Sequence, residues 1–519
     1  MYLCGMRKHF LSIIFLAFAA WLMPSCKSTQ KIGQKDDGLI QINLVQVNDV
    51  YEIAPVNQGR EGGLARVASI RKKYVSANPN TLLIMAGDFL SPSVYNSLKH
   101  EGKAIRGKQM VAAMNAAGFD IAIFGNHEFD IREQELQERI NESTFDWISS
   151  NAYHKKSNAL TPFVKTSGKM SQPLPEYQIR RFRDADGTEA KIGFIGIVLP
   201  FNKATYVGYT DPLGKAAELY ARIRDSVDAV VALTHQFIED DIRLAESLPG
   251  LAAIIGGHEH DQRFTVVNGI PISKALANAR SAYITGLTIN TRRKKVRVKS
   301  SLEPIDEKIT PDSLTQQVVD HWVRISDESL SSMGFQAKDV LIASGEPLEG
   351  RETYVRSQPT NLTKLIVAAM HAAAPKADIV LLNGGSVRVD DVLQMPLTQY
   401  DLVRALPFGG GIREIDIKGS LLLRILENGK ANIGTGGYLH VNESLQWNEK
   451  QSQWELNEKP VQPENMYRVA LTDFLLTGGE ARLEFLKPGH PDIVKVYDGP
   501  ASSEVASDIR KLVIEYIRN

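Results

Sequence analysis

The sequence predicts an α/β protein made of two consecutive α/β regions. Short apolar runs of strand length alternate with helical stretches from about residue 40 to residue 303, and a second region of the same kind follows from about residue 340. The chain has 519 residues, of which 43% are hydrophobic. At ~150 residues per domain this length suits about three domains, and two large domains are equally allowed.

The strands of the first region are predicted from apolar, partly β-branched runs that are too short for helices. Between some of these strands, apolar residues recur at helical spacing. The expected strands cover residues 41–47, 82–86, 121–124, 192–198, 229–233 and 251–255, and the expected helices include residues 64–75 and 108–117.

Residues 311–333 are predicted to form one amphipathic helix that bridges the two regions, because apolar residues from Leu314 to Leu330 recur at helical spacing. In the second region the same patterns predict further strands and helices. The strands are expected at residues 378–382, 414–417 and 468–471, and the helices at residues 362–373 and 421–427.

The first 26 residues are predicted to be a signal peptide. Arg7 and Lys8 precede an apolar run over residues 10–23, which is short for a membrane span and typical of a signal core. Cys26 stands where a bacterial lipoprotein carries its lipidated cysteine, although an ordinary signal peptide with an incidental cysteine remains open. We therefore expect an exported cell-envelope lipoprotein, in the periplasm or outer membrane, that touches the membrane only through a lipidated Cys26. Residues 27–39 would be its tether.

Charge and cysteine content narrow the classes of function. Sixty Lys and Arg balance sixty Asp and Glu, which argues against a nucleic-acid partner held by bulk charge. Cys4 and Cys26 are the only cysteines, and Cys4 would leave with the signal. The mature domain therefore has no disulfide, and a metal site would use His, Asp, Asn or water.

Five predicted strands end within one or two residues of an Asp, Asn or His. Sites in open α/β sheets form outside the carboxyl ends of the strands, so these side chains are expected to converge on one crevice. Such ligands suit Zn, Mn, Fe or Co, and six candidates are enough for two ions that share a carboxylate. A single histidine here is usually structural, but the set is specific: it comprises Asp49, Asp88, the run GNHEFD from Gly125, His235, and the run GGHEH from Gly256.

These motifs resemble those of the calcineurin-like metallophosphoesterases, and within them the 5′-nucleotidase/UDP-sugar hydrolase family of exported bacterial enzymes. The resemblance covers nearly the whole mature chain. It implies a four-layer αββα sandwich over residues 40–305 with two metals at its edge. A linker helix within residues 306–339 and a C-terminal nucleotide-binding domain over residues 340–519 would follow.

Motif matching to the family implies a role for each candidate residue. Asp88 would bridge two metal ions, and His127, held by Asp130, would form a catalytic dyad. Metal-activated water, with a pKa lowered toward about 7, would attack phosphorus in line. The first ion would be held by Asp49, Asp88 and His260, and the second by Asp88, Asn126, His235 and His258.

One position departs from the family pattern. The first motif is Asp-x-His in the family, and here it reads Asp49-Val50-Tyr51, so an imidazole ligand is missing. Tyr51 as a phenolate ligand would favour a harder ion such as ferric iron, whereas a Tyr51 that points away would leave the first position weak. We expect a retained two-metal site, because the other ligand positions are intact.

The second region resembles the family's nucleotide-binding domain. Phe408 and Phe474 match two rings that sandwich the base, and stacking accepts any base. Two positions depart: Gly410 replaces an asparagine, and Glu480 replaces an aspartate. The matching polar contacts are Arg356, Asn383 and Arg388, while Arg351 lies one residue from its expected place.

The first interpretation is a metal-dependent phosphohydrolase that takes a nucleotide or nucleotide-sugar substrate. The altered pocket positions leave open a second enzyme, which hydrolyses non-nucleotide esters such as cyclic phosphodiesters or thiosulfate conjugates. Tyr51 motivates a third interpretation, a lipoprotein that binds nucleotides and has lost catalysis.

Overall fold

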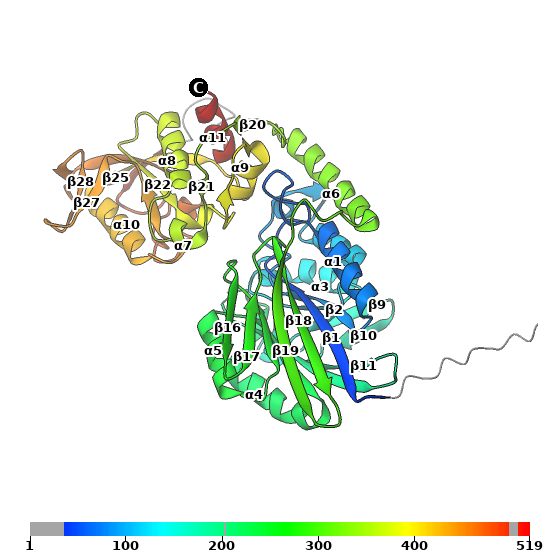
Figure 1. The fold of residues 1–519 in the computed structure, drawn as a ribbon. Coiled ribbons are helices and arrows are strands. Elements are labelled where there is room, and N and C mark those ends of the chain that lie inside the picture. Colours follow the sequence, from blue (N-terminus) through cyan, green and yellow to red (C-terminus); the bar gives the residue numbers. More distant parts are fainter. Residues whose placement is uncertain (1–35, 202–203, 498–506) are drawn as a thin grey trace, which may run out of the picture.

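The computed structural model describes residues 36–201, 204–497 and 507–519 and shows two α/β units next to each other, joined through a long helix, α6 (Ser313–Ser332) (Figure 1). The predicted signal peptide, Cys26 and the tether up to residue 35 lie outside the described residues. Among the helices of the described ranges, none is both long enough and apolar enough to cross a bilayer.

The first unit contains two six-stranded sheets, in the orders β19-β18-β1-β2-β5-β6 and β11-β12-β14-β15-β17-β16. Strands β1, β2, β5 and β6 run parallel, as do β12, β14, β15 and β17. The first sheet comprises β1 (Leu39–Val47), β2 (Thr81–Ala86), β5 (Ile121–Ile123), β6 (Asp146–Ile148), β18 (Ser281–Asn290) and β19 (Lys295–Pro304). The second comprises β11 (Tyr177–Arg183), β12 (Glu189–Val198), β14 (Ala229–His235), β15 (Ala253–Gly257), β16 (Arg263–Val267) and β17 (Ile270–Lys274).

The two sheets pack face to face through an apolar layer, and helices cover their outer faces. Strand β1 shows the pattern: Ile42 and Leu44 face the second sheet, whereas Val45 and Val47 face the helices. This four-layer αββα arrangement confirms the predicted fold class. One side is covered by α1 (Leu64–Ala77), α2 (Lys108–Ala117) and α3 (Glu133–Glu142), and the other by α4 (Pro212–Ile223) and α5 (Ile238–Ser247).

Additional short strands lie between the main elements of the first unit. They form one three-stranded sheet and two hairpins. The sheet is β13 (Val207–Tyr209), β7 (Ala152–Lys156) and β8 (Ala159–Thr161), and the hairpins are β9 (Val164–Ser167) with β10 (Met170–Pro173) and β3 (Lys99–His100) with β4 (Lys103–Ala104).

Helix α6 confirms the helix predicted over residues 311–333. Asp312 caps it by accepting a hydrogen bond of 3.0 Å from the Thr315 backbone N–H. The helix packs on α1 and α2, with Trp322 and Ile325 buried, and Phe335 is buried just beyond its end. Helix α6 therefore belongs to the outer helical layer of the first unit, and the chain enters the second unit after it.

The second unit is a five-stranded sheet in the order β26-β22-β30-β25-β31 with helices on both faces. Ile379 and Leu381 of β22 pack against α10, whereas Val380 and Leu382 face α8 and α11. The strands are β22 (Ile379–Asn383), β25 (Ile412–Lys418), β26 (Leu439–Val441), β30 (Met466–Thr472) and β31 (Ile493–Tyr497). The helices are α7 (Glu352–Val355), α8 (Asn361–Ala373), α9 (Gln399–Ala405), α10 (Gly419–Ala431) and α11 (Ile509–Arg518).

Three small sheets complete the second unit. They pair β20 (Val340–Ile342) with β24 (Leu397–Thr398), β21 (Leu348–Glu349) with β23 (Val392–Leu393), and β27 (Leu445–Asn448) with β28 (Gln453–Leu456) and β29 (Lys459–Pro460).

A buried histidine predicts how acid affects stability. His440 in β26 is almost fully buried, and its Nε2 lies 2.8 Å from the Val355 carbonyl oxygen. Burial lowers the pKa of His440 to about 4 in the folded protein, whereas an ordinary histidine has a pKa of 6.5. Between these two pH values His440 is therefore protonated in the unfolded chain and neutral in the folded chain. Stability contributed by neutral His440 is therefore present above pH 6.5 and is lost as the pH falls to 4. We expect this group to remove about 3 kcal/mol from the free energy of unfolding over that range.

Denaturant unfolding of the wild type and of His440→Gln at pH 7, 6, 5 and 4 measures this effect. The difference in unfolding free energy between the two proteins should shift in favour of the variant as the pH falls. His321→Gln, which changes an exposed histidine on α6, is the control and should track the wild type. A difference that stays constant with pH would show that His440 does not carry the acid sensitivity.

Candidate active site

Side chains from the ends of four strands, β1, β2, β14 and β15, meet at one edge of the first unit. Ligand-type atoms of Asp88, His235 and His258 lie within 4.8 Å of one another, and the same holds for Asp49, Asp88 and His260. Within these groups His235 Nε2 is 3.0 Å from Asp88 Oδ2, and His260 Nε2 is 3.3 Å from Asp49 Oδ1. Asp88 belongs to both groups. The structure thus brings these five predicted residues together and gives Asp88 the central place.

The backbone at this edge is unusual. Asp49, Asp88, His258 and His260 all have positive φ, between 52° and 98°. Non-glycine residues rarely adopt this conformation, and it concentrates at functional sites where the surrounding structure enforces it. It turns each side chain sharply off the end of its strand and toward the shared centre.

The donor atoms fit cations. Asn126 Oδ1 is buried and, among the described residues, has no hydrogen-bond partner, while the buried Asp49 Oδ1 and His235 Nε2 face His260 and Asp88 of the same cluster. Buried polar atoms are nearly always satisfied, so an unpartnered amide oxygen beside clustered carboxylates and imidazoles indicates ligands for a cation. Carboxylate, amide and imidazole groups together suit a divalent first-row metal.

Neighbouring groups fix which atom of each ligand faces the centre. His235 Nδ1 lies 2.8 Å from the Ala86 carbonyl oxygen, which directs Nε2 toward Asp88 and the centre of the cluster. Asp49 Oδ2 accepts from the His258 backbone N–H at 3.0 Å, and Asp88 Oδ1 accepts from the His127 backbone N–H at 2.7 Å. The second oxygen of each carboxylate is therefore the one presented to a cation.

The protonation states of His258 and His235 follow from their burial and from the charges near them. Burial lowers the pKa of His258 to about 3, which keeps it neutral and able to bind a metal. Burial also opposes the charged form of His235, but Asp88 and Asp49 outweigh this and raise the pKa of His235 to about 9. Cation binding beside His235 would therefore release a proton.

Sequence reasoning missed Glu128, although it stands inside the GNHEFD run. Its carboxylate is fully buried and accepts hydrogen bonds from the backbone N–H groups of Asp88, Phe89, Leu90 and Gly125, at 2.6 to 3.0 Å. Burial and the charge of Asp88 raise the pKa of Glu128 to about 7. Glu128 ties together the loops after β2 and β5, and its position between His127 and Asp130 was the available signal.

A buried lysine, also missed, supports the loop that carries His258 and His260. Lys274 Nζ is 2.6 Å from Glu259 Oε2, 3.0 Å from Asp241 Oδ2 and 2.6 Å from the Gln236 carbonyl oxygen. Glu259 stands between the two histidines in sequence, so this ion pair anchors their loop. A lone lysine at the end of an apolar strand gave no signal in the sequence.

The predicted dyad is formed, and it faces the second unit. His127 Nδ1 is 2.6 Å from Asp130 Oδ2. Arg388 of the second unit places its Nη2 3.5 Å from the same His127 nitrogen. The two units therefore meet at the dyad.

Tyr51 points into the cluster. Its hydroxyl lies 2.9 Å from His260 Nε2 and 3.4 Å from Asp88 Oδ2, and its ring is 5.4 Å from that of His260. Of the two orientations considered for Tyr51, the inward one is observed. Burial, with the charges of Asp88 and Asp49, raises the pKa of the Tyr51 phenol well above its usual range.

A cavity of about 680 Å³ lies between the units and adjoins the dyad. Phe408 and Phe474 are 69% and 44% exposed there, which is unusual for large apolar rings and indicates a binding surface. Asn383 Nδ2 donates to Glu480 Oε2 at 3.0 Å. The predicted residues on its wall are Asp130, Asn383, Arg388, Phe408, Phe474 and Glu480.

Arg356, also predicted to bind substrate, does not line this cavity. Its guanidinium contacts Glu352, and burial with the nearby charge of Arg388 lowers the pKa of Arg356 to about 10. Arg351 pairs with Glu349 and lines a different pocket. Arg356 therefore stands behind Arg388, which Glu352 also approaches at 3.7 Å.

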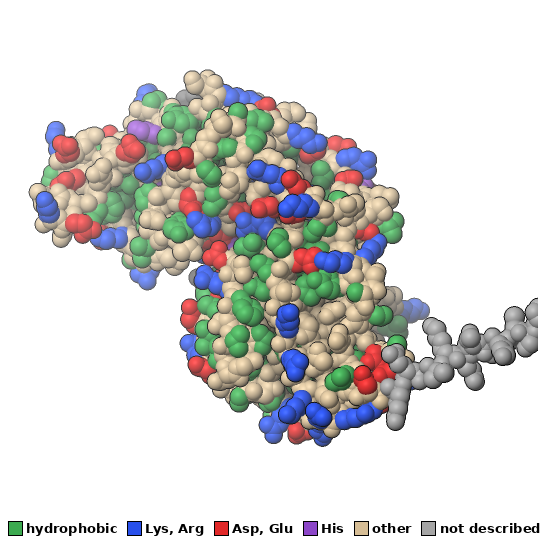
Figure 2. All heavy atoms as spheres, viewed as in Figure 1, with side chains coloured by type: hydrophobic (Ala, Val, Ile, Leu, Met, Phe, Trp, Pro, Cys, Tyr) green, Lys and Arg blue, Asp and Glu red, His purple; other side chains and the backbone are tan. Residues whose placement is uncertain are grey.

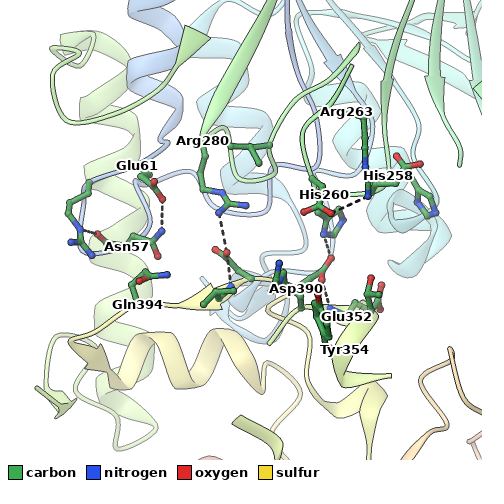
Figure 3. Close-up of a pocket in the computed structure, with 18 of the residues that line it drawn as sticks. Asn57, Glu61, His258, His260, Arg263, Arg280, Glu352, Tyr354, Asp390 and Gln394 are labelled. Carbon is green, nitrogen blue, oxygen red and sulfur yellow. Dashed lines mark hydrogen bonds and ion pairs between the residues drawn. The ribbon is translucent and has the colours of Figure 1, made fainter. Parts of the chain in front are cut away.

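That second pocket, of about 860 Å³, lies between the units on the side of His258 and His260 (Figure 3). Its walls are mainly charged and polar, and Asp390 of the second unit points across it at His260. Figure 2 shows acidic and basic side chains gathered where the two units meet. The candidate metal cluster is thus enclosed by both units.

Comparisons with known proteins agree with this architecture. The family model for calcineurin-like phosphoesterase matches residues 42–262, and that for the 5′-nucleotidase C-terminal domain matches residues 339–487. Protein UshA of Yersinia enterocolitica is 25% identical over 86% of this chain and 88% of its own length. The 5′-nucleotidase of Bos taurus is 24% identical over 85% and 83%. The crystal structure of a 5′-nucleotidase precursor from Thermus thermophilus has a TM-score of 0.69 at 20% identity and covers 92% of this chain and 96% of its own.

Proposed function

The chain belongs to the calcineurin-like phosphoesterases that carry a 5′-nucleotidase C-terminal domain, hydrolases of phosphoric ester bonds, and we propose that it releases phosphate from nucleotides. One observation carries the proposal. The cavity with the exposed Phe408 and Phe474 shares a wall with Asp130 of the dyad, beside the metal-type cluster. A base held between the rings would direct its phosphate toward that cluster.

The cofactors we propose are two divalent cations of the group Zn, Mn, Fe and Co. When bound, such ions neutralise phosphoryl charge and lower the pKa of water enough to supply a nucleophile at neutral pH. Asp49, Asp88 and His260 would hold the first. Asp88, Asn126, His235 and His258 would hold the second.

The remaining residues would bind and orient the substrate. His127, kept in one orientation by Asp130, faces the gap with Arg388 and can donate to phosphoryl oxygens as negative charge builds up on them. Asn383 and Glu480 form a polar pair suited to sugar hydroxyls. Gly410 removes an amide contact to the base edge worth about 1 kcal/mol, so we propose breadth among bases.

Export as a lipoprotein through Cys26 remains part of the proposal. Its support is the sequence of residues 1–26, with a basic start, an apolar core and a cysteine.

Hydrolysis of AMP, UDP-glucose, a cyclic nucleotide and p-nitrophenyl phosphate, followed by identification of the products and with metals added singly, tests the substrate class. Stacking is worth about 1–3 kcal/mol per base, so Phe474→Ala should raise KM for nucleotides by roughly 10- to 100-fold. It should leave turnover of p-nitrophenyl phosphate nearly unchanged.

Phe264→Ala, which removes an equally exposed ring outside the cavity, is the matched control and should leave all four substrates unaffected. An enzyme that prefers the non-nucleotide ester and ignores Phe474→Ala would instead support the alternative ester hydrolase.

The role of Tyr51 separates the phosphohydrolase from a second candidate function, a nucleotide-binding protein without catalysis. Its hydroxyl contacts His260 and Asp88, so the phenol is placed to act as a ligand in place of an imidazole. We expect protein loaded with ferric iron to show a phenolate-to-metal charge-transfer band that disappears in Tyr51→Phe. Tyr283→Phe, which changes another buried phenol, should retain the band.

A band that survives Tyr51→Phe would exclude Tyr51 as a ligand. Loss of metal binding in the wild type, together with retained nucleotide binding and no phosphate release, would favour the binding protein.

A further inference from the structure

One segment of the second unit contacts both parts of the candidate active site. Residues 388–391 lie against the first unit, with Arg388 at His127 and Asp390 at His260. Asp390 Oδ2 contacts His260 Nδ1 (Figure 3). On the other side of the ring, His260 Nε2 faces Asp49 Oδ1 at 3.3 Å and the Tyr51 hydroxyl at 2.9 Å. A carboxylate from one unit therefore contacts the outer nitrogen of a candidate metal ligand in the other.

The orientation of Asp390 is fixed from its own side. Its Oδ1 accepts a hydrogen bond from the Glu352 backbone N–H at the start of α7, which leaves Oδ2 for His260. Its φ is 38°, in the left-handed region that costs energy for a residue with a side chain. Strain of this kind persists where surrounding contacts enforce it, so Asp390 is held in place toward His260 by its own unit.

Buried charges keep this segment against the first unit. Asp391 is buried, and its Oδ1 lies 3.2 Å from Arg280 Nη1 of the first unit. Glu52, which follows Tyr51, accepts from the Tyr400 hydroxyl at 2.7 Å and lies 3.6 Å from Arg404 Nε. These pairs are removed from water, so the contact at His260 belongs to a continuous, specific interface.

We propose that Asp390 is a positioning residue for His260, supplied by the second unit, so that cation binding at the first position and closure of the two units stabilise each other. Histidines that bind metals usually donate their other N–H to a carboxylate or carbonyl, which fixes the ring and strengthens the ligand. Here that partner is present only while the units are together. By thermodynamic linkage, bound cation shifts the equilibrium toward the closed arrangement by a certain factor. Closure raises the affinity for the cation by the same factor. This inference rests on the two-cation site of the proposed function.

The second cation position does not depend on the other unit in this way. His235 directs its Nδ1 at the Ala86 carbonyl oxygen, within its own unit. The effect of removing Asp390 is therefore confined to one of the two positions, which separates it from a general loss of the interface.

Isothermal titration of the full, metal-free protein with Mn²⁺ tests the proposal. Asp390→Ala should weaken one of two binding steps by roughly 10- to 100-fold and leave the other unchanged. Asp390→Asn retains an acceptor oxygen and should recover part of the loss. Gln58→Ala, which removes hydrogen bonds to the Gln394 and Pro396 carbonyls across the same interface, should bind both ions as the wild type does.

Small-angle X-ray scattering gives a second readout that does not depend on activity. Mn²⁺ should reduce the radius of gyration of the wild type and of Gln58→Ala, and it should reduce that of Asp390→Ala less. Unchanged titrations of Asp390→Ala, or equal weakening of both steps, would overturn the inference and leave the proposed function standing. A wild type that binds fewer than about one ion would overturn the proposed function itself.

Discussion

The active-site geometry depends on how closely the strand ends of two stacked sheets approach each other. A Cβ at Gly87 would lie 2.5 Å from His235 Nδ1 of the other sheet, and a Cβ at Gly257 would lie 2.6 Å from the Ala86 carbonyl oxygen. Glycine alone fits in such gaps. Because the sheets meet this tightly at one edge, ligands far apart in sequence reach a common centre without long loops, and Asp88 becomes the group they share.

Buried charge has to be compensated around that centre. Glu128 accepts four backbone N–H groups, and Lys274 sits between Glu259 and Asp241. Through these hydrogen bonds and ion pairs, Glu128 and Lys274 hold the loops that carry the candidate ligands in place. Arg388 and Asp390 of the second unit contact His127 and His260, so the surroundings of the cluster come from both units.

The sequence predicted the parallel strands well, because β2 and β14 are buried on both faces and read as continuous apolar runs. It missed the hairpin of β18 and β19, since β19 alternates between half-buried and exposed residues and lacks such a run. The strand predicted over residues 251–255 is observed two residues further along the chain, as β15 (Ala253–Gly257), because Leu251 and Ala252 still belong to the connection that follows the turn at residues 249–250.

Some residues of the candidate site could likewise be predicted from the sequence, and others could not. Asp49, Asp88 and His235 were predictable because polar residues at apolar strand ends stand out. Arg356 stays a predicted substrate contact, and its pairing with Glu352 is visible only in three dimensions. The contact of Asp390 with His260 joins two units far apart in the chain, and sequence spacing cannot reveal it.

Asp88 is proposed to hold two cations at once, and the metal content per chain is the measurement closest to that role. Wild type and Asp88→Ala are equilibrated with Mn²⁺, freed of unbound metal and analysed by mass spectrometry, with Asp130→Ala as a control outside the ligand set. We expect about two ions per chain in wild type and Asp130→Ala, and fewer than one in a folded Asp88→Ala. Two ions retained by Asp88→Ala would contradict it.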